Sequence, residues 1–383
     1  MKEIGVGIIG MGWMGEAHSN AYNNIKSKFA SLNVSPKLII CSEIIEERAQ
    51  AAKKRFGFEK CTTDWKKVVE DPAVDIVDIT APNSLHLEMI EYCIKHKKHI
   101  NCEKPVGAFP DDTIKAYELV KNYEKETFVG YNYRWSPLVQ EAKRLIEEGA
   151  IGELRHFRGR FFSCYAADEL GFYSWRFEKE NGHGALTDIM SHAVDMAINL
   201  MGEVKEVQGV MDTFIKQRPI APAGASHYAK GSKNDEMKDV TNDDYVNAIV
   251  KFKNGARGYI DSSRAFYGPT SEMSFEVHGS KGSMKWNFEE MNTLHLYIHE
   301  EGQANGYRKI YSSPLHSNHG NFNPSDGSGL GYEDLKAIEA ANFLNVIVNK
   351  DESKKVNFED AKNVAHVLNA IIQSNENKTV VSL

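Results

Sequence analysis

Over the first 130 residues, short apolar runs alternate with longer segments whose apolar positions repeat at helical spacing. Short apolar runs are typical of strands buried in a parallel sheet, and the longer segments are typical of the helices that connect such strands. The predicted strands are residues 4–9, 37–41, 74–80, 99–102 and 128–131, and the predicted helices are residues 16–28, 46–55, 85–95 and 111–124. This alternation predicts a doubly wound parallel sheet of the Rossmann type with right-handed crossovers, ending near residue 130.

Beyond residue 130 the pattern changes, because apolar and polar residues alternate with a period of two. Such alternation predicts antiparallel strands that bury one face and leave the other to solvent or an interface. We expect strands at residues 154–164, 204–215, 245–252, 256–263, 272–278 and 283–288, helices at residues 137–148, 184–201, 332–348 and 358–373, and loops at residues 217–242 and 316–331. Because 383 residues exceed one ordinary core, we predict an α/β protein with two domains, residues 1–130 and 131–383.

The composition argues against several classes of partner. A net charge of −7 disfavours nucleic acid or an anionic membrane surface as a main partner. No apolar run approaches the roughly 18 residues of a membrane span, and the first residues lead directly into a strand without the features of a secretory signal. The five cysteines are scattered and contain no C-x-x-C pair, as expected of reduced thiols. We therefore expect a cytoplasmic protein.

The first predicted strand leads into a glycine-rich turn with the spacing G-x-G-x-x-G. Gly10 permits a tight turn, Gly12 lets the backbone approach a pyrophosphate, and Gly15 lets the following helix pack close to the strand. The pyrophosphate would lie against the N–H groups at the start of that helix, where the helix dipole favours negative charge. We therefore predict that these glycines, with the intervening Trp13 and Met14, bind a dinucleotide.

The end of the second predicted strand bears on the choice of dinucleotide. Glu43 follows this strand, where the Rossmann plan places an acid on the adenosine ribose diol. An acid there repels a 2′-phosphate and so favours NAD over NADP. Arg48 lies close enough to bind a phosphate and keeps NADP as an alternative. Glu43 has a second interpretation, as an exposed carboxylate that precedes a helix.

Two further segments follow strands at the edge of the sheet that carries ligands in open α/β folds. The first contains Pro82, Asn83 and His86, where Asn83 has the alternative role of a helix cap. The second contains Glu103 and Lys104, followed by a proline that biases the backbone toward extended geometry. A lysine in a cofactor cleft can stabilise an alkoxide that develops on a substrate. The alternative for Lys104 is a solvated surface position.

A helix predicted in the second domain carries acid–base groups at i, i+4 and i+7. These are Asp188, His192 and Asp195, which share one helix face. A carboxylate one turn before a histidine can orient the ring and raise its proton affinity, which suits the histidine to accept a proton. In one alternative, Asp188 and Asp195 are a helix cap and a solvent-facing charge, and His192 is a histidine of the core. Another is a metal site with His183, which the lack of a second His-rich cluster disfavours; we expect no metal.

Together these motifs resemble those of the Gfo/Idh/MocA family of sugar and polyol oxidoreductases. The resemblance spans the chain, and the segment of residues 130–134 adds to it. It implies an N-terminal Rossmann domain followed by an α/β domain with a large open, mainly antiparallel sheet. In the family that sheet commonly mediates dimers or tetramers, so the resemblance also implies a homo-oligomer.

The resemblance implies roles for individual residues. Lys104, Asp188 and His192 correspond to the catalytic group, in which the lysine and histidine contact the reacting hydroxyl and the aspartate contacts substrate and histidine. The resemblance also implies that these three residues bind substrate. The remaining residues implied to contact cofactor are Pro82, Asn83, His86, Glu103, Lys104 and Asn132, and those implied to contact substrate include Arg134, Trp175 and Arg176.

The chain departs from the family pattern near the predicted catalytic helix. His183 replaces the middle one of three glycines, and Met190 replaces a frequent glycine, so both changes alter the wall of the predicted pocket. The segments of residues 174–177 and 329–334 resemble those of a subgroup that acts on inositols, anhydrosugars or glycosides. Trp175 offers an apolar plate suited to a pyranose face.

These observations predict an NAD(H)-dependent dehydrogenase that oxidises a secondary ring hydroxyl of a sugar, glycoside or cyclitol to a ketone. His192 would take the hydroxyl proton, Lys104 would stabilise the oxygen, and Asp188 would orient the histidine. One alternative is a glycoside hydrolase that recycles tightly held NAD. Another is a cofactor-dependent sensor without catalysis, which the presence of Lys104 and His192 disfavours.

Overall fold

The computed structural model describes residues 1–222, 229–302 and 304–383. Contacts divide the chain into two compact units. Unit 1 comprises Met1–Gly107, Asp111–Ser136 and Ser313–Lys362, and unit 2 comprises Ala108–Pro110, Pro137–Ser312 and Asn363–Leu383. Unit 1 thus includes a segment from near the C-terminal end, which the predicted division at residue 130 does not anticipate.

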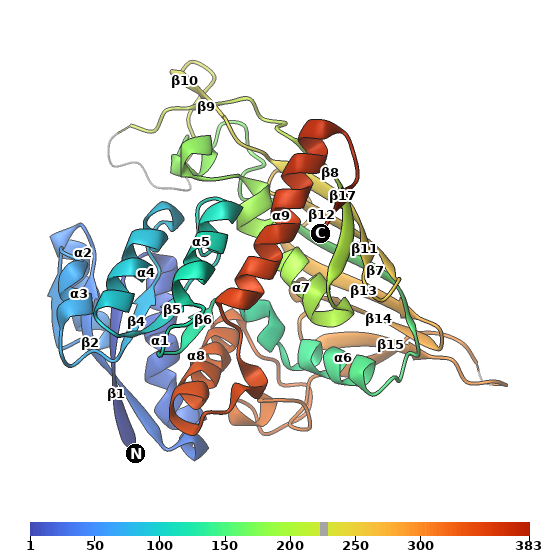
Figure 1. Cartoon of the computed structure of the whole chain (residues 1–383), viewed down its shortest axis with the longest axis horizontal. Helices are drawn as coiled ribbons and strands as arrows, with labels where there is room; N and C mark the ends of the chain where they lie inside the picture. Colours follow the sequence, from blue (N-terminus) through green and yellow to red (C-terminus); the bar gives the residue numbers. More distant parts are fainter. Residues whose placement is uncertain (223–228, 303) are drawn as a thin grey trace. The chain divides into compact units, whose positions relative to one another are not determined.

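Unit 1 is built on a parallel sheet. Its described residues form six parallel strands in the order β3-β2-β1-β4-β5-β6 (Figure 1), which is the strand order of a Rossmann fold. The strands are β1 (Lys2–Ile9), β2 (Val34–Ser42), β3 (Lys60–Thr62), β4 (Ile76–Ile79), β5 (His99–Cys102) and β6 (Thr127–Val129). The last six residues of β1 are buried, as expected for a central strand covered on both faces.

The helices of unit 1 form two groups. Helix α1 contacts both α2 and α8, and α3 contacts α4. Right-handed crossovers place these two groups on opposite faces of the sheet. The bounds are α1 (Trp13–Lys28), α2 (Glu46–Phe56), α3 (Lys66–Glu70), α4 (His86–Lys95), α5 (Pro110–Val120) and α8 (Tyr332–Asn349). Helix α8 buries most of its surface, including two charged side chains, Lys336 and Glu339.

Unit 2 is built on a large mixed sheet. Its described residues form nine strands in the order β16-β15-β14-β13-β7-β12-β11-β8-β17. Only β7 and β12 pair in parallel among these described strands. The bounds are β7 (Leu154–Ser163), β8 (Val204–Asp212), β11 (Tyr245–Phe252), β12 (Arg257–Ser263), β13 (Ser271–Gly279), β14 (Gly282–Asn287), β15 (Thr293–Ile298), β16 (Arg308–Tyr311) and β17 (Val381–Ser382). We call this the large sheet.

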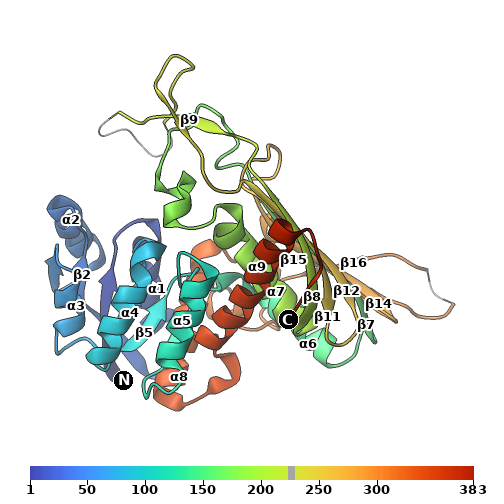
Figure 2. The same ribbon diagram turned by 45° about the horizontal axis from the view of Figure 1, so that its top comes forward.

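Helices cover one face of the large sheet. They are α6 (Pro137–Glu147), α7 (Ser191–Met201) and the second half of α9 (Phe358–Asn377), and Figure 2 shows the sheet nearly edge-on with these helices on one side. Strands β9 (Gln217–Pro219) and β10 (Met237–Asp239) form a separate two-stranded antiparallel sheet. Among the described residues, none of the helices combines the length and apolar character needed to cross a membrane.

The sequence predictions and the structure differ at particular elements. The predicted loop of residues 217–242 contains strands β9 and β10, and its residues 223–228 lie outside the described part of the chain. The predicted helix of residues 184–201 begins with a π-helical turn at Leu186–Met190. The short strand β3 and the outer strands β15 to β17 were not predicted, because few residues and mixed polarity give them no clear period.

Candidate functional site

The turn between β1 and α1 distinguishes three glycines that look equivalent in sequence. Gly10 has φ +92°, and a Cβ added to it would lie 2.9 Å from the backbone nitrogen of Ala81. A Cβ added to Gly15 would lie 2.0 Å from the carbonyl oxygen of Gly10. A Cβ added to Gly12 would meet no described atom within 4 Å. Packing within the protein therefore requires glycine at 10 and 15, whereas Gly12 leaves a cradle that only a ligand would need.

The start of α1 fits the pyrophosphate of a dinucleotide. Gly12 is the N-cap of this 16-residue helix, and no side chain caps it by a hydrogen bond. Backbone N–H groups and the helix dipole therefore favour an anion at this turn. Trp13 is 67% exposed and stacks on Tyr332, and the Tyr332 hydroxyl donates to the Met14 sulfur at 3.6 Å. Unit 1 thus has residues that fit a bound dinucleotide.

Glu43 lies beside the same turn. It follows β2, and its Oε2 accepts a hydrogen bond from the backbone N–H of Met11 at 3.2 Å. The carboxylate therefore lies at the carboxyl end of the sheet, where the sequence placed a ribose-binding acid. Arg48 is exposed on α2, so its contact with a cofactor stays a prediction.

The segment after β4 forms a short 3-10 turn at Asn83–Leu85 with Pro82 at its start. His86 begins α4 and is buried, with Nε2 2.8 Å from the carbonyl oxygen of Ala81 and Nδ1 3.4 Å from the sulfur of Cys102. Burial holds the pKa of His86 below its ordinary value. A neutral ring that bridges the ends of β4 and β5 fixes this turn in place.

Glu103 and Lys104 follow β5, and their environments differ. The Glu103 side chain is buried, and its Oε2 accepts the backbone N–H of Lys104 at 3.2 Å. Lys104 is half-buried, and its peptide bond to Pro105 is cis. The sequence predicted that both residues follow this strand, and they do. It gave no sign that Glu103 belongs to a larger buried cluster of charges.

Asn132 and Arg134 lie on a 3-10 turn after β6, and both are buried. The Nδ2 atom of Asn132 is buried and has no hydrogen-bond partner among the described residues. A buried amide donor without a partner is costly unless a ligand satisfies it, so Asn132 supports a ligand here. Arg134 pairs with Asp360 at 3.1 Å, and its predicted contact with substrate stays a prediction.

In unit 2, Asp188 and His192 lie on consecutive helical segments. Asp188 belongs to the π-helical turn and is half-buried, whereas His192 is in the first turn of α7 and is 6% exposed. The His192 ring lies against Phe161 of β7, with centroids 5.8 Å apart. π-helical turns occur frequently at functional sites. Asp195 lies further along α7 and is buried.

Tyr165 is a candidate site residue that the sequence reasoning missed. Its hydroxyl donates to Oδ2 of Asp188 at 2.8 Å, and its side chain is 41% exposed. The hydrogen bond restricts the carboxylate on one side. No spacing in the sequence connects Tyr165, in the loop after β7, with a helix more than twenty residues later; only the fold does.

The start of the Asp188 segment is held by a second carboxylate. Asp243 accepts the backbone N–H of Gly184 at 2.9 Å and that of Leu186 at 2.7 Å, so one side chain satisfies two donors of the helix start. A Cβ added to Gly184 would lie 2.0 Å from the Asp243 carbonyl oxygen. His183 lies beside the same carboxylate, with Nδ1 3.5 Å from Oδ1. The glycine that precedes the helix therefore serves close packing on the Asp243 loop.

Trp175 and Arg176 form a 3-10 turn with Phe177. The Arg176 guanidinium lies over the Trp175 ring, 4.4 Å from its centroid, and Trp175 is 38% exposed. The Arg176 carbonyl oxygen accepts from Arg264, which forms a buried ion pair with Asp244 at 2.9 Å. The turn is thus anchored through its backbone, and the two side chains remain at the surface of unit 2.

The structure groups the predicted residues by unit. In unit 1, the predicted residues lie at the carboxyl ends of the strands. They are the turn glycines, Glu43, the residues after β4, Lys104 and the residues after β6. Asp188, His192 and the Trp175 turn belong to unit 2. Among the described residues, the group spaced like metal ligands is a different one, formed by His18, Glu103 and Glu339.

A Rossmann unit with this turn, joined to a unit that carries acid–base side chains, defines a nucleotide-dependent oxidoreductase. The sequence model of an oxidoreductase family with an NAD-binding Rossmann fold matches residues 4–131, and the model of the GFO/IDH/MocA C-terminal domain matches residues 139–285. The chain is 36% identical over 377 residues to levoglucosan dehydrogenase of Pseudarthrobacter phenanthrenivorans, which covers 98% of this chain and 96% of that protein. It is 29% identical over 278 residues to myo-inositol 2-dehydrogenase of Thermotoga maritima, covering 72% and 73%.

Solved structures agree with the sequence relatives. A levoglucosan dehydrogenase in complex with NADH and L-sorbose has a TM-score of 0.93 and 35% identity, covering 100% of this chain and 99% of that one. The chain therefore belongs to the GFO/IDH/MocA family of oxidoreductases, and its Rossmann unit binds NAD. The predicted resemblance, fold class, enzyme class and cofactor are confirmed.

Proposed function

We propose that this enzyme oxidises a secondary ring hydroxyl of a sugar or cyclitol to a ketone, with an anhydrosugar such as levoglucosan as the first candidate substrate. The observation that carries the proposal is the similarity to levoglucosan dehydrogenase along almost the whole chain. Relatives named as inositol dehydrogenases, over about three quarters of the chain, support the same class of substrate.

The proposed reaction assigns a role to each of three side chains. His192 takes the hydroxyl proton, and the Lys104 ammonium stabilises the negative charge that develops on the same oxygen. Asp188 orients His192 and is itself held by the Tyr165 hydroxyl. When bound, NAD supplies the acceptor for the hydride that leaves the carbinol carbon. The substrate thus loses one proton and one hydride and becomes a ketone.

Cofactor selection follows from Glu43. Its carboxylate lies beside the glycine turn, where it would accept hydrogen bonds from a ribose diol and repel a 2′-phosphate. We therefore propose NAD as the physiological cofactor in preference to NADP.

The test is a substrate screen read by the absorbance of reduced nicotinamide. Levoglucosan, inositols, aldoses and aryl glycosides are each incubated with NAD or NADP. The proposal expects NADH to accumulate with at least one sugar or cyclitol, one NADH per substrate consumed. Cleavage of a glycoside without accumulated NADH would instead support a hydrolase that recycles its cofactor, and binding without any turnover would support a sensor.

We also propose that two or more copies of the chain associate through the uncovered face of the large sheet. That face carries exposed apolar side chains, Val210 at 51% and Ile249 at 55%, and a groove lined in part by Arg158, Glu272 and Lys285. Light scattering after size-exclusion chromatography should give the mass of a dimer or tetramer. The mass of a single chain would contradict this proposal.

We place the enzyme in the cytoplasm. Its five cysteines all lie in the described part of the chain and are free thiols, which suits a reducing compartment. A disulfide detected by mass spectrometry in protein purified from its native cells would contradict this placement.

A further inference from the structure

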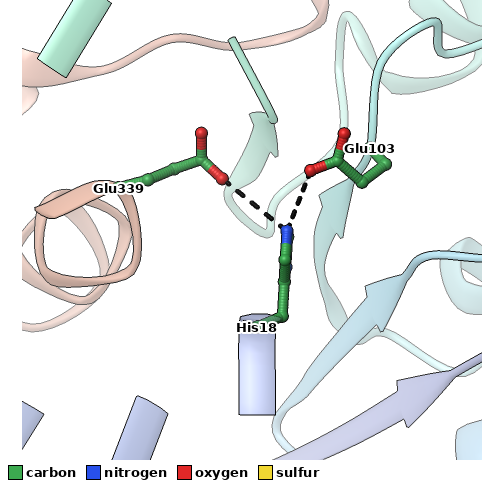
Figure 3. A group of neighbouring side chains, drawn as sticks. All are labelled: His18, Glu103 and Glu339. Atoms are coloured by element: carbon green, nitrogen blue, oxygen red, sulfur yellow. Dashed lines mark hydrogen bonds and ion pairs between the residues drawn. The ribbon is translucent and has the colours of Figure 1, made fainter. Parts of the chain in front are cut away.

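A cluster of buried charges lies in unit 1, and the proposed reaction leaves most of it unexplained. Its side chains come from α1, β4, the end of β5 and α8. Each of these side chains is at most 8% exposed. Figure 3 shows the His18 ring directed from α1 toward the carboxylates of Glu103 and Glu339. The members are His18, Asp78, Glu103, Lys336 and Glu339.

His18 is held by carboxylates at both ring nitrogens. Nδ1 lies 2.9 Å from Oδ2 of Asp78, and Nε2 lies 2.9 Å from Oε1 of Glu103. Both nitrogens can donate only when the ring is protonated. Burial alone lowers the pKa of His18, but the charge of Asp78 and the hydrogen bonds to both carboxylates outweigh it and raise the pKa to about 9. His18 is therefore a buried cation at neutral pH.

Lys336 supplies the second buried cation. Its ammonium donates to Oε1 of Glu103 and, at 3.0 Å, to Oε1 of Glu339, and the side chain is 1% exposed. The ligand-like atoms of His18, Glu103 and Glu339 lie within 4.8 Å of one another, a spacing that also suits a metal ion. Because the Lys336 ammonium donates to carboxylate oxygens of two of these three residues, the cluster already contains a cation. The geometry therefore favours an internal ion network over a metal site.

The cluster reaches the catalytic lysine through Glu103. Oε1 of Glu103 accepts from His18 and Lys336, which leaves Oε2 to accept the backbone N–H of Lys104 at 3.2 Å. Gly130 closes the remaining side, because a Cβ added there would lie 2.7 Å from Oε1 of Glu103. The carboxylate thus has one orientation, and that orientation fixes the backbone of Lys104.

We infer that Lys336 is a positioning residue for catalysis: its ammonium fixes the Glu103 carboxylate and, through it, the backbone from which the Lys104 side chain extends. The inference rests on the proposed role of Lys104. A buried ion pair contributes little net stability compared with apolar side chains of similar volume, so stability alone gives a weak reason for this pair. An error of about 1 Å in the placement of a catalytic group costs up to about 10²-fold in rate. A positioning role therefore gives a strong reason for a buried ion pair at this place.

The first test follows the Lys104 amide itself in protein without cofactor. Hydrogen–deuterium exchange is measured on the peptide that contains residue 104 in wild type, Lys336→Met and Glu103→Gln. We expect exchange about tenfold faster in both variants, as for the loss of one hydrogen bond of about 1.4 kcal/mol. Lys355→Met is the matched control, because Lys355 belongs to the same unit and pairs with Glu126 and Glu352 outside the cluster; its exchange at residue 104 should equal that of wild type.

The second test separates positioning from stability. Lys336→Met leaves a buried carboxylate without its cation, so a lower thermal midpoint is expected on either account. The positioning account adds a fall in kcat of about 10- to 100-fold for folded enzyme, with a smaller change in KM. In a Glu103→Gln background, Lys336→Met should change kcat and exchange little further, because the carboxylate that Lys336 fixes is already replaced by an amide.

The outcomes distinguish the inference from the proposed function. If Lys336→Met is folded and has wild-type exchange at residue 104 and wild-type kcat, the inference is overturned while the function stands. If Lys336→Met does not fold, the measurement is made on the double variant Glu103→Gln with Lys336→Met. Wild-type exchange at residue 104 in that variant overturns the inference. A wild-type enzyme that oxidises no sugar or cyclitol overturns the function, which the exchange measurement does not depend on.

Discussion

At the scale of single residues, the glycine turn shows how one motif combines two kinds of constraint. Gly15 is required because a side chain would collide with the Gly10 carbonyl, whereas no described atom approaches the Cβ position of Gly12. Sequence reasoning correctly predicted a dinucleotide turn from the spacing. It could not separate Gly15, which the fold requires, from Gly12, for which we propose a role in binding the ligand, because the sequence shows only that both are glycine.

This difference predicts opposite results for two matched substitutions. Gly12→Ala should leave the free energy of unfolding within about 1 kcal/mol of wild type, the cost of a change without a clash, and should weaken NADH binding at least tenfold. Gly15→Ala should destabilise the fold by about 1–3 kcal/mol or more, as overpacking does. Chemical denaturation and fluorescence titration with NADH measure the two effects. A Gly12→Ala variant that binds NADH like wild type would contradict the assignment of the pyrophosphate site.

The charge of His18 predicts a dependence of stability on pH. The pKa of this ring is about 9 in the folded protein and 6.5 for an ordinary histidine, so the folded state holds the proton more tightly. The stabilisation is complete below pH 6.5 and is lost as the pH rises toward 9, a loss of about 3 kcal/mol. The titratable groups that act on His18 are Asp78, Glu103, Lys336 and Glu339, and Tyr22 on the same helix interacts with Asp78 and Glu339.

The measurement is the free energy of unfolding between pH 6.5 and 9 in wild type and His18→Gln. Wild type should lose stability across this window, and the variant should lose much less. Glu339 also titrates within this window, because burial raises its pKa to about 7. The difference between wild type and His18→Gln therefore carries the test, rather than the wild-type slope alone. Equal slopes in the two proteins would show that His18 does not carry the charge assigned to it.

At the scale of elements, the predicted period of each segment was a good guide to its type. The parallel strands and their helices in unit 1 follow the predicted alternation, and the long strands of the large sheet follow the predicted period of two. The predictions were incomplete where tertiary contacts decide. The π-helical turn at Leu186–Met190 depends on how Asp243 holds its start, and this contact joins residues more than fifty positions apart.

The contacts of Asp243 predict that catalysis depends on a residue outside the helix that carries the proposed catalytic residues. Asp243→Asn keeps one acceptor oxygen for two N–H groups, so one donor of the helix start loses its partner. We expect a loss of about 1–3 kcal/mol in the free energy of unfolding and a fall in kcat of about tenfold. The control is Asp239→Asn, the same change at an exposed residue whose side chain contacts Gln217. Equal kcat in the two variants would show that the helix start is held without the Asp243 carboxylate.

At the scale of the whole molecule, the chain returns late in its sequence to complete its first unit. Helix α8 packs on α1 and brings Lys336 to Glu103, which is 233 positions earlier. A division at residue 130 follows the change in hydrophobic pattern, and no local pattern reveals that a distant helix belongs with the first sheet. The sequence therefore named the residues of the proposed site, whose roles stay predictions, and it gave no sign of the buried contacts that hold them.

The central claim is a proposal: Lys104 of unit 1 and His192 of unit 2 both act in the oxidation of the substrate. The most direct test compares kcat and NADH binding of Lys104→Met and His192→Gln on the substrate found in the screen, with Lys115→Met, an exposed lysine of α5, as control. Each catalytic variant should lose about 10²- to 10⁴-fold in kcat and still bind NADH, while the control keeps wild-type values. Wild-type kcat in either catalytic variant would contradict the account.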